Sequence, residues 1–413
     1  MEQKKYSVFN LAVIVGALGY FVDVYDLLLF SIIRVPSLKS IGLSAEDIRS
    51  KGAEIISIQM IGLLLGGILW GVLGDKLGRL KVLFASIILY SLGSIANGFV
   101  HTVDQYAIVR FITGLGLAGE LGAGITLVSE LMSKEKRGIA TSLVAGIGLS
   151  GAVFAYFIKV KFGADAEGWR TCYFIGGGLG FVLLLLRVGI LESGMYKNIK
   201  QSNVSKGNFF MLFTNGVRLK KYLTSILIAL PNWYVIGILI TFSNEFATLM
   251  HVQGPVDPGK GIMVAYVAIS VGDVLIGFVS QWLKSRKGSL YIFHVISIIG
   301  IVWFFNLQGQ SSNMVYWACA VMGFGTGFWA MFVTMAAEQF GTNIRATVAT
   351  TVPNMARGSL SLVVIPIFDA LKPSLGYFKS GAVTGVIVFV VAFVALILTK
   401  ETFGKDLDYI EPA

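Results

Sequence analysis

The stretch GVLGDKLGRLKVL at residues 71–83 decides the fold, because two long apolar segments meet at it. Its glycines let two helices approach closely at a tight turn, and Asp75 can accept hydrogen bonds from a neighbouring helix end or basic side chain. Lys76, Arg79 and Lys81 make the turn basic. Short basic loops between membrane helices stay on the cytoplasmic side. The stretch therefore predicts a cytoplasmic hairpin between two membrane-spanning helices.

The composition of the whole chain requires lipid as its solvent. Of 413 residues, 55% are hydrophobic and 14% are charged, with a mean hydropathy of +0.77, whereas an ordinary globular chain carries about 25% charged residues. The net charge of +10 is spread over short basic clusters between apolar stretches, which argues against a nucleic-acid-binding protein. Cys172 and Cys319 fall inside apolar segments without metal spacing, so we expect neither a disulfide nor a metal site.

Apolar stretches long enough to span a membrane occur twelve times in the chain. A bilayer core needs about 20 apolar residues per helix. The predicted spans are 11–33, 52–73, 82–100, 105–129, 139–158, 170–190, 222–249, 261–283, 289–307, 313–336, 346–367 and 379–399. The first is longer than a signal-peptide core and has no cleavage site behind it, so we expect it to be retained. We predict an all-α membrane protein with two six-helix bundles, at residues 1–191 and 222–413, joined by a basic linker at 192–221.

The basic clusters also predict how the chain is oriented. They fall at Lys4 and Lys5, in the loop after the second span, at 134–137, in the linker and at 284–287. If the N-terminus is inside, all of these lie on one side, and positive charge is retained on the cytoplasmic side. We therefore expect a multi-pass protein of the plasma (inner) membrane with both termini and the linker in the cytoplasm.

An internal repeat relates the two predicted bundles. GLGLAG (114–119) is followed by Glu130 and Arg137, and GFGTG (323–327) is followed by Glu338 and Arg345. Each arginine lies seven residues after its glutamate, and the two arginines are 208 residues apart. Parallel repeats related by an axis along the membrane normal occur in transporters, with the binding site near the midplane between the halves. The repeat therefore predicts pseudo-symmetric bundles around a central site.

Three stretches resemble motifs of the major facilitator superfamily. GVLGDKLGRLKVL is similar to its signature loop, RFITGLGLAGE (110–120) to its fourth-helix motif, and GYFVDVYDLL (19–28) to the acidic first helix of its proton-coupled metabolite and sugar porters. The resemblance covers essentially the whole chain. It implies alternating access, function as a monomer, no cofactor, and a cytoplasmic latch that holds one state. Alternatively, the signature loop is a solvated turn that carries topology charges. The candidate latch residues are Gly71, Asp75, Gly78, Arg79, Glu130 and Arg137.

Ionisable residues in the first bundle are candidates for proton coupling, since a charge at a span centre costs several kcal/mol unless it is paired. Asp23 and Asp26 are three residues apart and share a helix face. Asp26 and Arg110 lie at depths that match within roughly 3 Å. A carboxylate that releases an arginine when protonated can act as a coupling switch, while the alternative is a permanent salt bridge. Glu120 is a further candidate, for protonation, for binding a cationic group or for a structural pair.

In the second bundle, Arg357 falls at the centre of the eleventh span, where a cation suits an anionic substrate group. The competing interpretation is an ion pair between Arg357 and Asp273 in the eighth span. Pro231 interrupts the seventh span and should expose backbone and polar groups beside it. The candidate substrate-binding residues are Tyr25, Asn232, Trp233, Trp329, Asn354 and Arg357.

The favoured function is secondary active transport of a small organic solute, anionic or zwitterionic, in symport with protons. The expected partners are this solute, protons and the lipid bilayer. No Walker motif or catalytic motif is present, and none surrounds His101, His251 or His294, so we expect no enzyme activity. Uniport, and export of drugs or metabolites, are the alternatives within transport. A transporter-like receptor without flux is the alternative of a different class.

Overall fold

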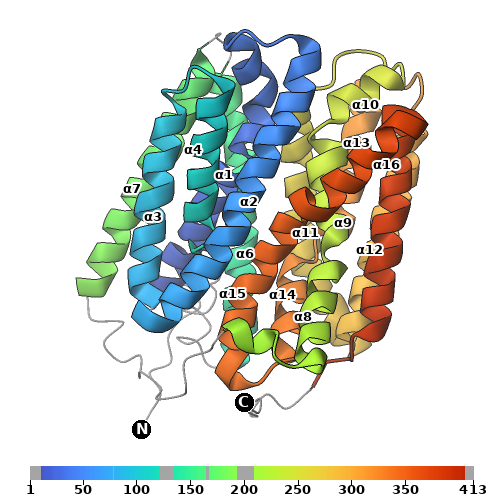
Figure 1. Cartoon of the computed structure of the whole chain (residues 1–413). Helices are drawn as coiled ribbons and strands as arrows, with labels where there is room; N and C mark the ends of the chain where they lie inside the picture. Colours follow the sequence, from blue (N-terminus) through green and yellow to red (C-terminus); the bar gives the residue numbers. More distant parts are fainter. Residues whose placement is uncertain (1–10, 78, 121–133, 164–166, 193–208, 405–413) are drawn as a thin grey trace.

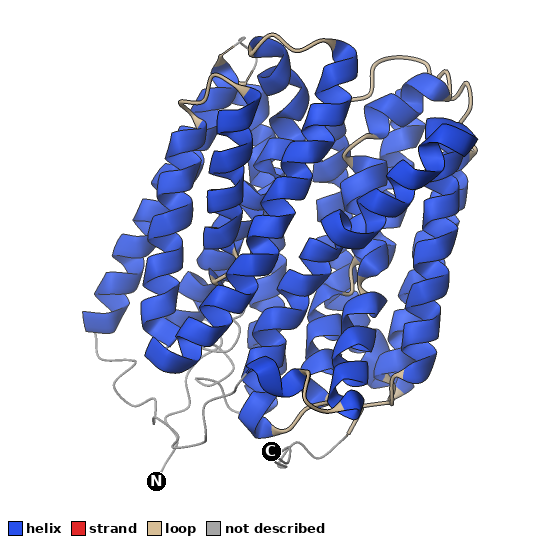
Figure 2. Ribbon diagram, viewed as in Figure 1, coloured by secondary structure: helices blue, strands red, loops and turns tan. Residues whose placement is uncertain are grey.

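The computed structural model describes residues 11–77, 79–120, 134–163, 167–192 and 209–404 as a bundle of helices (Figure 1). Figure 2 shows these helices joined by loops, and the described ranges contain no strand. The first half of the chain forms α1 (Leu11–Ser40), α2 (Ala45–Leu77), α3 (Arg79–Asn97), α4 (Val103–Leu117), α6 (Lys134–Phe162) and α7 (Gly168–Glu192).

The second half of the chain forms shorter pieces as well as long helices. These are η1 (Phe209–Leu212), α8 (Gly216–Ile228), α9 (Leu230–Tyr234), η2 (Val235–Ile240), α10 (Ser243–Leu249), α11 (Pro258–Leu283), α12 (Arg286–Phe305), α13 (Ser312–Thr326), α14 (Trp329–Glu338), α15 (Thr342–Ser359), η3 (Leu360–Val364) and α16 (Ile365–Leu398). The described part of the predicted linker thus includes the start of α8. The division into two domains with a linker stays a prediction.

Helices lie in each of the twelve predicted spans, of which the fourth is described only to Glu120, and the predicted fold class is confirmed. Within the described residues, nine segments are long and apolar enough to cross a membrane, and one of them runs from Thr347 to Leu398. That segment holds two passes, because Gly376 has a left-handed φ of 72° and kinks α16. Many helices extend past the predicted spans, as α1 does to Ser40, since their polar ends project beyond the apolar stretch.

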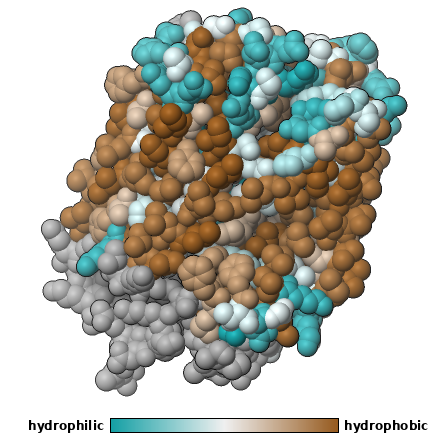
Figure 3. Space-filling model, in the orientation of Figure 1, coloured by the Kyte–Doolittle hydropathy of each residue, from teal (hydrophilic) through white to brown (hydrophobic). Residues whose placement is uncertain are grey.

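The surface of the bundle is that of a membrane protein. Apolar residues cover the middle of the face shown in Figure 3, while hydrophilic residues gather at its upper end. Large apolar side chains point outward on the helices, and Trp282 is 81% exposed. Such a surface is stable only when lipid covers it. The chain is therefore an integral, multi-pass membrane protein.

Close contact between α2 and α4 positions the first bundle around its buried charges. A Cβ added to Gly62 would overlap the carbonyl oxygen of Phe111, and one added to Gly114 would overlap that of Gln59. Small residues let membrane helices approach until their backbones touch. This contact brings the arginine side of α4 against α1 and α2.

Helices of the second half are interrupted in the middle of the bundle. The seventh pass is broken between α8 and α9, beside Pro231, and continues as the π-helix η2. The tenth pass is broken between α13 and α14, where Gly327 and Phe328 leave helical geometry. Breaks at membrane depth release backbone groups from helical hydrogen bonds and are typical of substrate sites in transporters.

The two ends of the bundle can be defined from the chain direction. We call the end at which α1 begins and α16 ends the terminal end, and the opposite end the distal end (Figure 1). The halves are joined along their length, because α6 packs against α11 and α2 packs against α15.

Reporter fusions test the predicted orientation. Fusions at Ala413 and at Ser205 are expected to report the same side, the cytoplasm, because an even number of predicted passes separates these positions. A fusion at Gly309, in the exposed loop between α12 and α13, is the matched control and should report the opposite side. If the fusions at Ala413 and Ser205 report different sides of the membrane, the twelve-pass topology is contradicted.

Candidate functional site

A narrow cavity lies between the two halves of the chain. The first half contributes residues of α1 and α6, and the second half contributes residues of α9, α11, α14 and α15. The lining residues are Tyr20, Val24, Leu27, Leu149, Asn232, Trp233, Tyr266, Ile269, Trp329 and Arg357. Because both halves form its wall, any movement of one half against the other changes its shape.

Arg357 is the cationic group of this cavity and forms an ion pair across the two halves. Its Nη2 lies 3.1 Å from Oδ2 of Asp23, and both side chains are buried. Nε and Nη1 of Arg357, and Oδ1 of Asp23, have no hydrogen-bond partner among the described residues. The guanidinium therefore retains donors for a second acceptor.

Two tryptophans beside Arg357 add further donors. The rings of Trp233 and Trp329 meet in a T-shaped contact with centroids 6.2 Å apart, and Cζ of Arg357 lies 5.9 Å from the ring centroid of Trp329. The buried Nε1 atoms of both tryptophans lack an acceptor in the described part of the chain. An indole N–H can only donate, so this wall of the cavity offers N–H groups to an acceptor.

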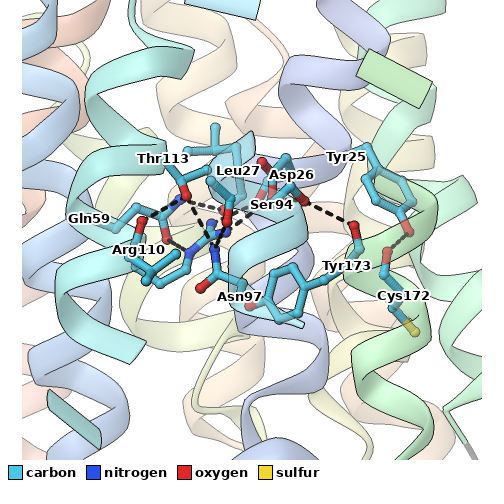
Figure 4. Close-up of polar contacts among 12 residues, drawn as sticks. Tyr25, Asp26, Leu27, Gln59, Ser94, Asn97, Arg110, Thr113, Cys172 and Tyr173 are labelled. Atoms are coloured by element: carbon cyan, nitrogen blue, oxygen red, sulfur yellow. Dashed lines mark hydrogen bonds and ion pairs between the residues drawn. The ribbon is translucent and has the colours of Figure 1, made fainter. Parts of the chain in front are cut away.

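Asp26 and Arg110, whose depths match in the sequence, are in contact inside the first bundle (Figure 4). Nη1 of Arg110 lies 3.0 Å from Oδ1 of Asp26, and Nη2 donates to the backbone carbonyl of Asp26 at 2.8 Å. Nε of Arg110 donates to Gln59, and Ser94 donates to Asp26. The pair joins α1 to α4 within one half. This geometry fits both a coupling switch and a permanent salt bridge.

Three other predicted site residues lie away from the cavity wall. The hydroxyl of Tyr25 donates to the carbonyl of Cys172 in α7 at 2.8 Å. Tyr25 is two residues after Asp23, so the two side chains leave α1 on different faces. Nδ2 of Asn354 donates to the carbonyl of Ala118 at 2.9 Å. Glu120 pairs with Arg187 of α7 through both carboxylate oxygens. Glu120 is thus held within the first half, while Asn354 connects the halves.

Asp273 does not pair with Arg357, so the ion pair considered from the sequence is wrong. Oδ1 of Asp273 instead accepts a hydrogen bond from the backbone N–H of Ala330 at 2.9 Å. The reason is the break between α13 and α14, which brings a helix start with unpaired N–H groups to this side chain. Periodicity alone does not predict such a break.

Most of the candidate latch lies outside the described residues. This applies to the side chains of Asp75, Arg79 and Arg137 and to the whole of Gly78 and Glu130. Gly71 is described and faces Thr351 of α15. In the second half, the repeat counterpart of Glu130 is Glu338, which pairs with Arg286 at 3.2 Å. Thr402 also donates to Glu338, at 2.7 Å, so the second half contains a polar cluster at its terminal end.

The cavity is closed toward the distal end by ion pairs that the sequence analysis missed. Arg34 of α1 pairs with Glu245 of α10 at 2.9 Å and also donates to the carbonyl of Thr241. Lys159 of α6 pairs at 2.6 Å with Asp257, the residue that caps α11. Both pairs join the two halves. Arg34 could have been singled out from the sequence, because it is a basic residue that directly follows the predicted end of the first span, 11–33.

Two halves that line a shared cavity, are joined beside it by a buried ion pair and are joined again by ion pairs at the distal end have the architecture of a membrane transporter. The family model described as the Major Facilitator Superfamily matches residues 16–366. The chain belongs to this superfamily, which confirms the resemblance seen in the sequence motifs. It is accordingly a secondary transporter of a small organic solute and not an enzyme.

Similar proteins of known name span the whole chain. The niacin transporter NiaP of Acinetobacter baylyi is 26% identical, and the match covers 97% of this chain and 96% of that protein. The sialic acid transporter NanX of Escherichia coli is 24% identical over 94% of this chain and 92% of its own length. Among solved structures, the proton:xylose symporter XylE from E. coli aligns with a TM-score of 0.70 and 19% identity over 97% of each chain. That structure supports the fold.

Glu245→Gln is expected to open the distal end more often, because Arg34 then keeps its charge in a buried site without its counterion. We expect a cysteine at Leu149, in a background with Cys172 and Cys319 replaced by alanine, to react at least about tenfold faster with an impermeant maleimide from the distal side. This corresponds to roughly 1.4 kcal/mol in the opening equilibrium.

Lys51→Gln is the matched control. Lys51 pairs with Glu54 at the same end of the bundle, but the two side chains are 47% and 51% exposed. Exposed pairs contribute little, so labelling should stay at the parent rate. Equal rates for Glu245→Gln and the parent would show that the Arg34 pair does not hold the distal end closed.

Proposed function

We propose that the protein transports a small organic carboxylate together with protons, and that the carboxylate binds Arg357 in the cavity between the halves. One observation carries this proposal: the cavity wall holds N–H donors without acceptors in the described residues, at Nε and Nη1 of Arg357 and at Nε1 of Trp233 and Trp329. Asn232 and Tyr266 add polar groups to the same wall.

A carboxylate satisfies these donors better than other small ligands do. A guanidinium matches the two oxygens of a carboxylate and binds them through parallel hydrogen bonds. Each buried donor without an acceptor costs about 1–3 kcal/mol, and an anionic ligand would recover part of that cost. A cationic ligand would meet Arg357 with like charge. Niacin and sialic acid, for which two of the relatives are named, are both carboxylic acids and support this class of substrate.

Proton coupling follows from competition for Arg357. Asp23 already occupies one side of its guanidinium. When the substrate carboxylate binds the donors of Arg357 that Asp23 leaves free, two carboxylates share one positive charge in a site from which water is excluded. An ionised carboxylate is costly there, so Asp23 should take up a proton. One proton would then accompany each carboxylate.

The same competition links binding to movement of the halves. Asp23 lies on α1 and Arg357 on α15, so their ion pair has to break or shift when the halves separate. A substrate between them replaces the pair without leaving Arg357 uncompensated. Asp26 and Arg110 lie within one half and can remain paired throughout. Geometry thus favours Asp23 as the proton carrier linked to substrate, with Asp26 and Glu120 as the other candidate acids.

Several further features are part of the same proposal. The protein would act as a monomer in the plasma (inner) membrane, with both termini in the cytoplasm. The candidate latch at Gly71, Asp75, Gly78, Arg79, Glu130 and Arg137 would hold the terminal end. An inward proton gradient would then drive uptake of the carboxylate. The proton symport named for the solved xylose transporter supports this coupling.

Proteoliposomes with an imposed pH gradient test the proposal, with radiolabelled nicotinate and sialic acid as probes and uncharged nicotinamide as the control ligand. Asp23→Asn should lose accumulation against the gradient, because it cannot take up a proton. It should keep exchange of carboxylate across the membrane, because Arg357 is still available. Arg357→Gln should lose both activities.

The outcome for Asp26→Asn separates the two acids. Lost accumulation in Asp26→Asn together with normal accumulation in Asp23→Asn would assign the proton to the Asp26 and Arg110 pair and contradict the role of Asp23. If the parent equilibrates the carboxylate but never accumulates it, the protein is a uniporter. Transport of nicotinamide in preference to either acid would contradict recognition of a carboxylate.

A further inference from the structure

Asp273 is a buried acid that the proposed transport mechanism does not use. It lies in the middle of α11 and is 4% exposed. Oδ1 accepts the hydrogen bond from Ala330, while Oδ2 is buried and has no partner among the residues that the structure describes. No ion pair joins Asp273 to a lysine or arginine in those ranges. A buried carboxyl group without a cation calls for an explanation.

The hydrogen bond to Ala330 joins Asp273 to the break in the tenth pass. α14 starts again at Trp329 in the middle of the bundle, and the first N–H groups of a helix have no partner within it. A Cβ on Gly272 would lie 2.6 Å from the carbonyl oxygen of Phe324 and 3.2 Å from Cα of Gly327, so α11 and the break are in backbone contact. The contact leaves the next residue, Asp273, beside the start of α14, where it caps the helix from another element.

Two opposing effects act on the charge of this carboxyl group. The start of α14 favours the anion, by about 0.3–1 kcal/mol and up to about 2 kcal/mol in buried geometries. Burial without a cation favours the neutral form by several kcal/mol. A proton on Oδ2, the oxygen without a partner, resolves the second effect. It also turns a charge-assisted cap into a neutral hydrogen bond, which is roughly half as strong.

The charged groups on the elements around α11 are engaged elsewhere. On α1, Asp23 binds Arg357. On α12, the ring nitrogens of His294 lie 2.8 and 3.1 Å from the carbonyls of Leu290 and Ile228. Charged residues of α6, α10 and α14 form ion pairs near the two ends of the bundle. Lys159 of α6 pairs with Asp257, Glu245 of α10 pairs with Arg34, and Glu338 of α14 pairs with Arg286. The remaining titratable groups on these elements and on α11 and α13 are Tyr20, Tyr25, Asp26, Lys39, Tyr156, Lys161, Lys260, Tyr266, Lys287, Tyr291, Tyr316 and Cys319, together with residues 134–137 at the start of α6, whose side chains lie outside the described part of the chain.

The residue that α14 carries at its start is Trp329, which forms part of the cavity wall next to Arg357. We propose that Asp273 is a proton-binding site that controls the position of Trp329. The charged form caps α14 and holds Trp329 against the cavity. Protonation loosens the cap and lets the start of α14 and its tryptophan move. The inference rests on the proposed function only in taking Trp329 as a substrate contact, because the protonation step itself needs no substrate.

The test follows the fluorescence of Trp329 in purified full-length protein, without substrate or gradient, from about pH 5 to about pH 8. The chain has seven tryptophans, so the signal of Trp329 is obtained by subtracting the Trp329→Phe variant. The parent should show a pH-dependent Trp329 signal. Asp273→Asn keeps an oxygen for the cap but cannot take up a proton, so its Trp329 signal should lose the pH dependence.

Asp23→Asn is the matched control. Asp23 pairs with Arg357, whose Cζ lies 5.9 Å from the Trp329 ring, and without substrate this pair is intact, so the pH-dependent signal should survive the replacement of Asp23. A signal that persists in Asp273→Asn, or that disappears in Asp23→Asn alone, overturns the inference. Absence of a pH-dependent Trp329 signal in the parent overturns it as well. None of these results bears on carboxylate binding at Arg357, because no substrate is present.

A measurement on the parent protein covers the case in which Asp273→Asn fails to fold. Hydrogen exchange of the peptide from 324 to 334, corrected for the intrinsic effect of pH, reports the cap on the Ala330 amide. Protection should fall as the pH is lowered, while that of a peptide in the middle of α12 should stay constant. Constant protection of both peptides would show that Asp273 is a fixed helix cap.

Discussion

The guanidinium of Arg357 lies in the middle of a membrane bundle, and its only acceptor in the described chain is a carboxylate from the opposite half. A charge at this depth costs several kcal/mol unless it is paired. The pair with Asp23 therefore holds the halves together across the cavity, and it can be replaced only by another anion. The cavity wall and the proposed coupling both depend on this requirement.

Ion pairs inside the first half have a different effect from ion pairs between the halves. Asp26 with Arg110 and Glu120 with Arg187 tie α1 to α4 and the end of the fourth pass to α7. These pairs make the first half a single unit. By contrast, Arg34 with Glu245 and Lys159 with Asp257 join the halves near the distal end, and they have to break for that end to open. The second half contains the interrupted seventh and tenth passes, and the ends of α9 and α14 at these breaks can move when a ligand binds.

The sequence predicted the fold because membrane helices leave a local signal. Long apolar stretches, with basic loops on one side, located the helices as far as the structure describes them, and depth counting along two helices brought Asp26 and Arg110 together. Partners across the halves leave no such signal. Asp23 and Arg357 are 334 residues apart, and their contact depends on how two bundles pack. The pairing of Asp273 with Arg357, one of two interpretations that the sequence left open, is wrong, because the helix break that presents Ala330 to Asp273 cannot be derived from periodicity.

Counting protons during substrate binding tests the central claim, that a carboxylate bound to Arg357 competes with Asp23 for its charge and makes Asp23 take up a proton. Calorimetric titration of the purified protein with nicotinate, in buffers of different ionisation enthalpy, gives the number of protons exchanged with each bound anion. The account predicts uptake of about one proton per nicotinate near neutral pH. It also predicts none for Asp23→Asn, which should still bind. Binding of nicotinate by the parent without proton uptake would contradict the account.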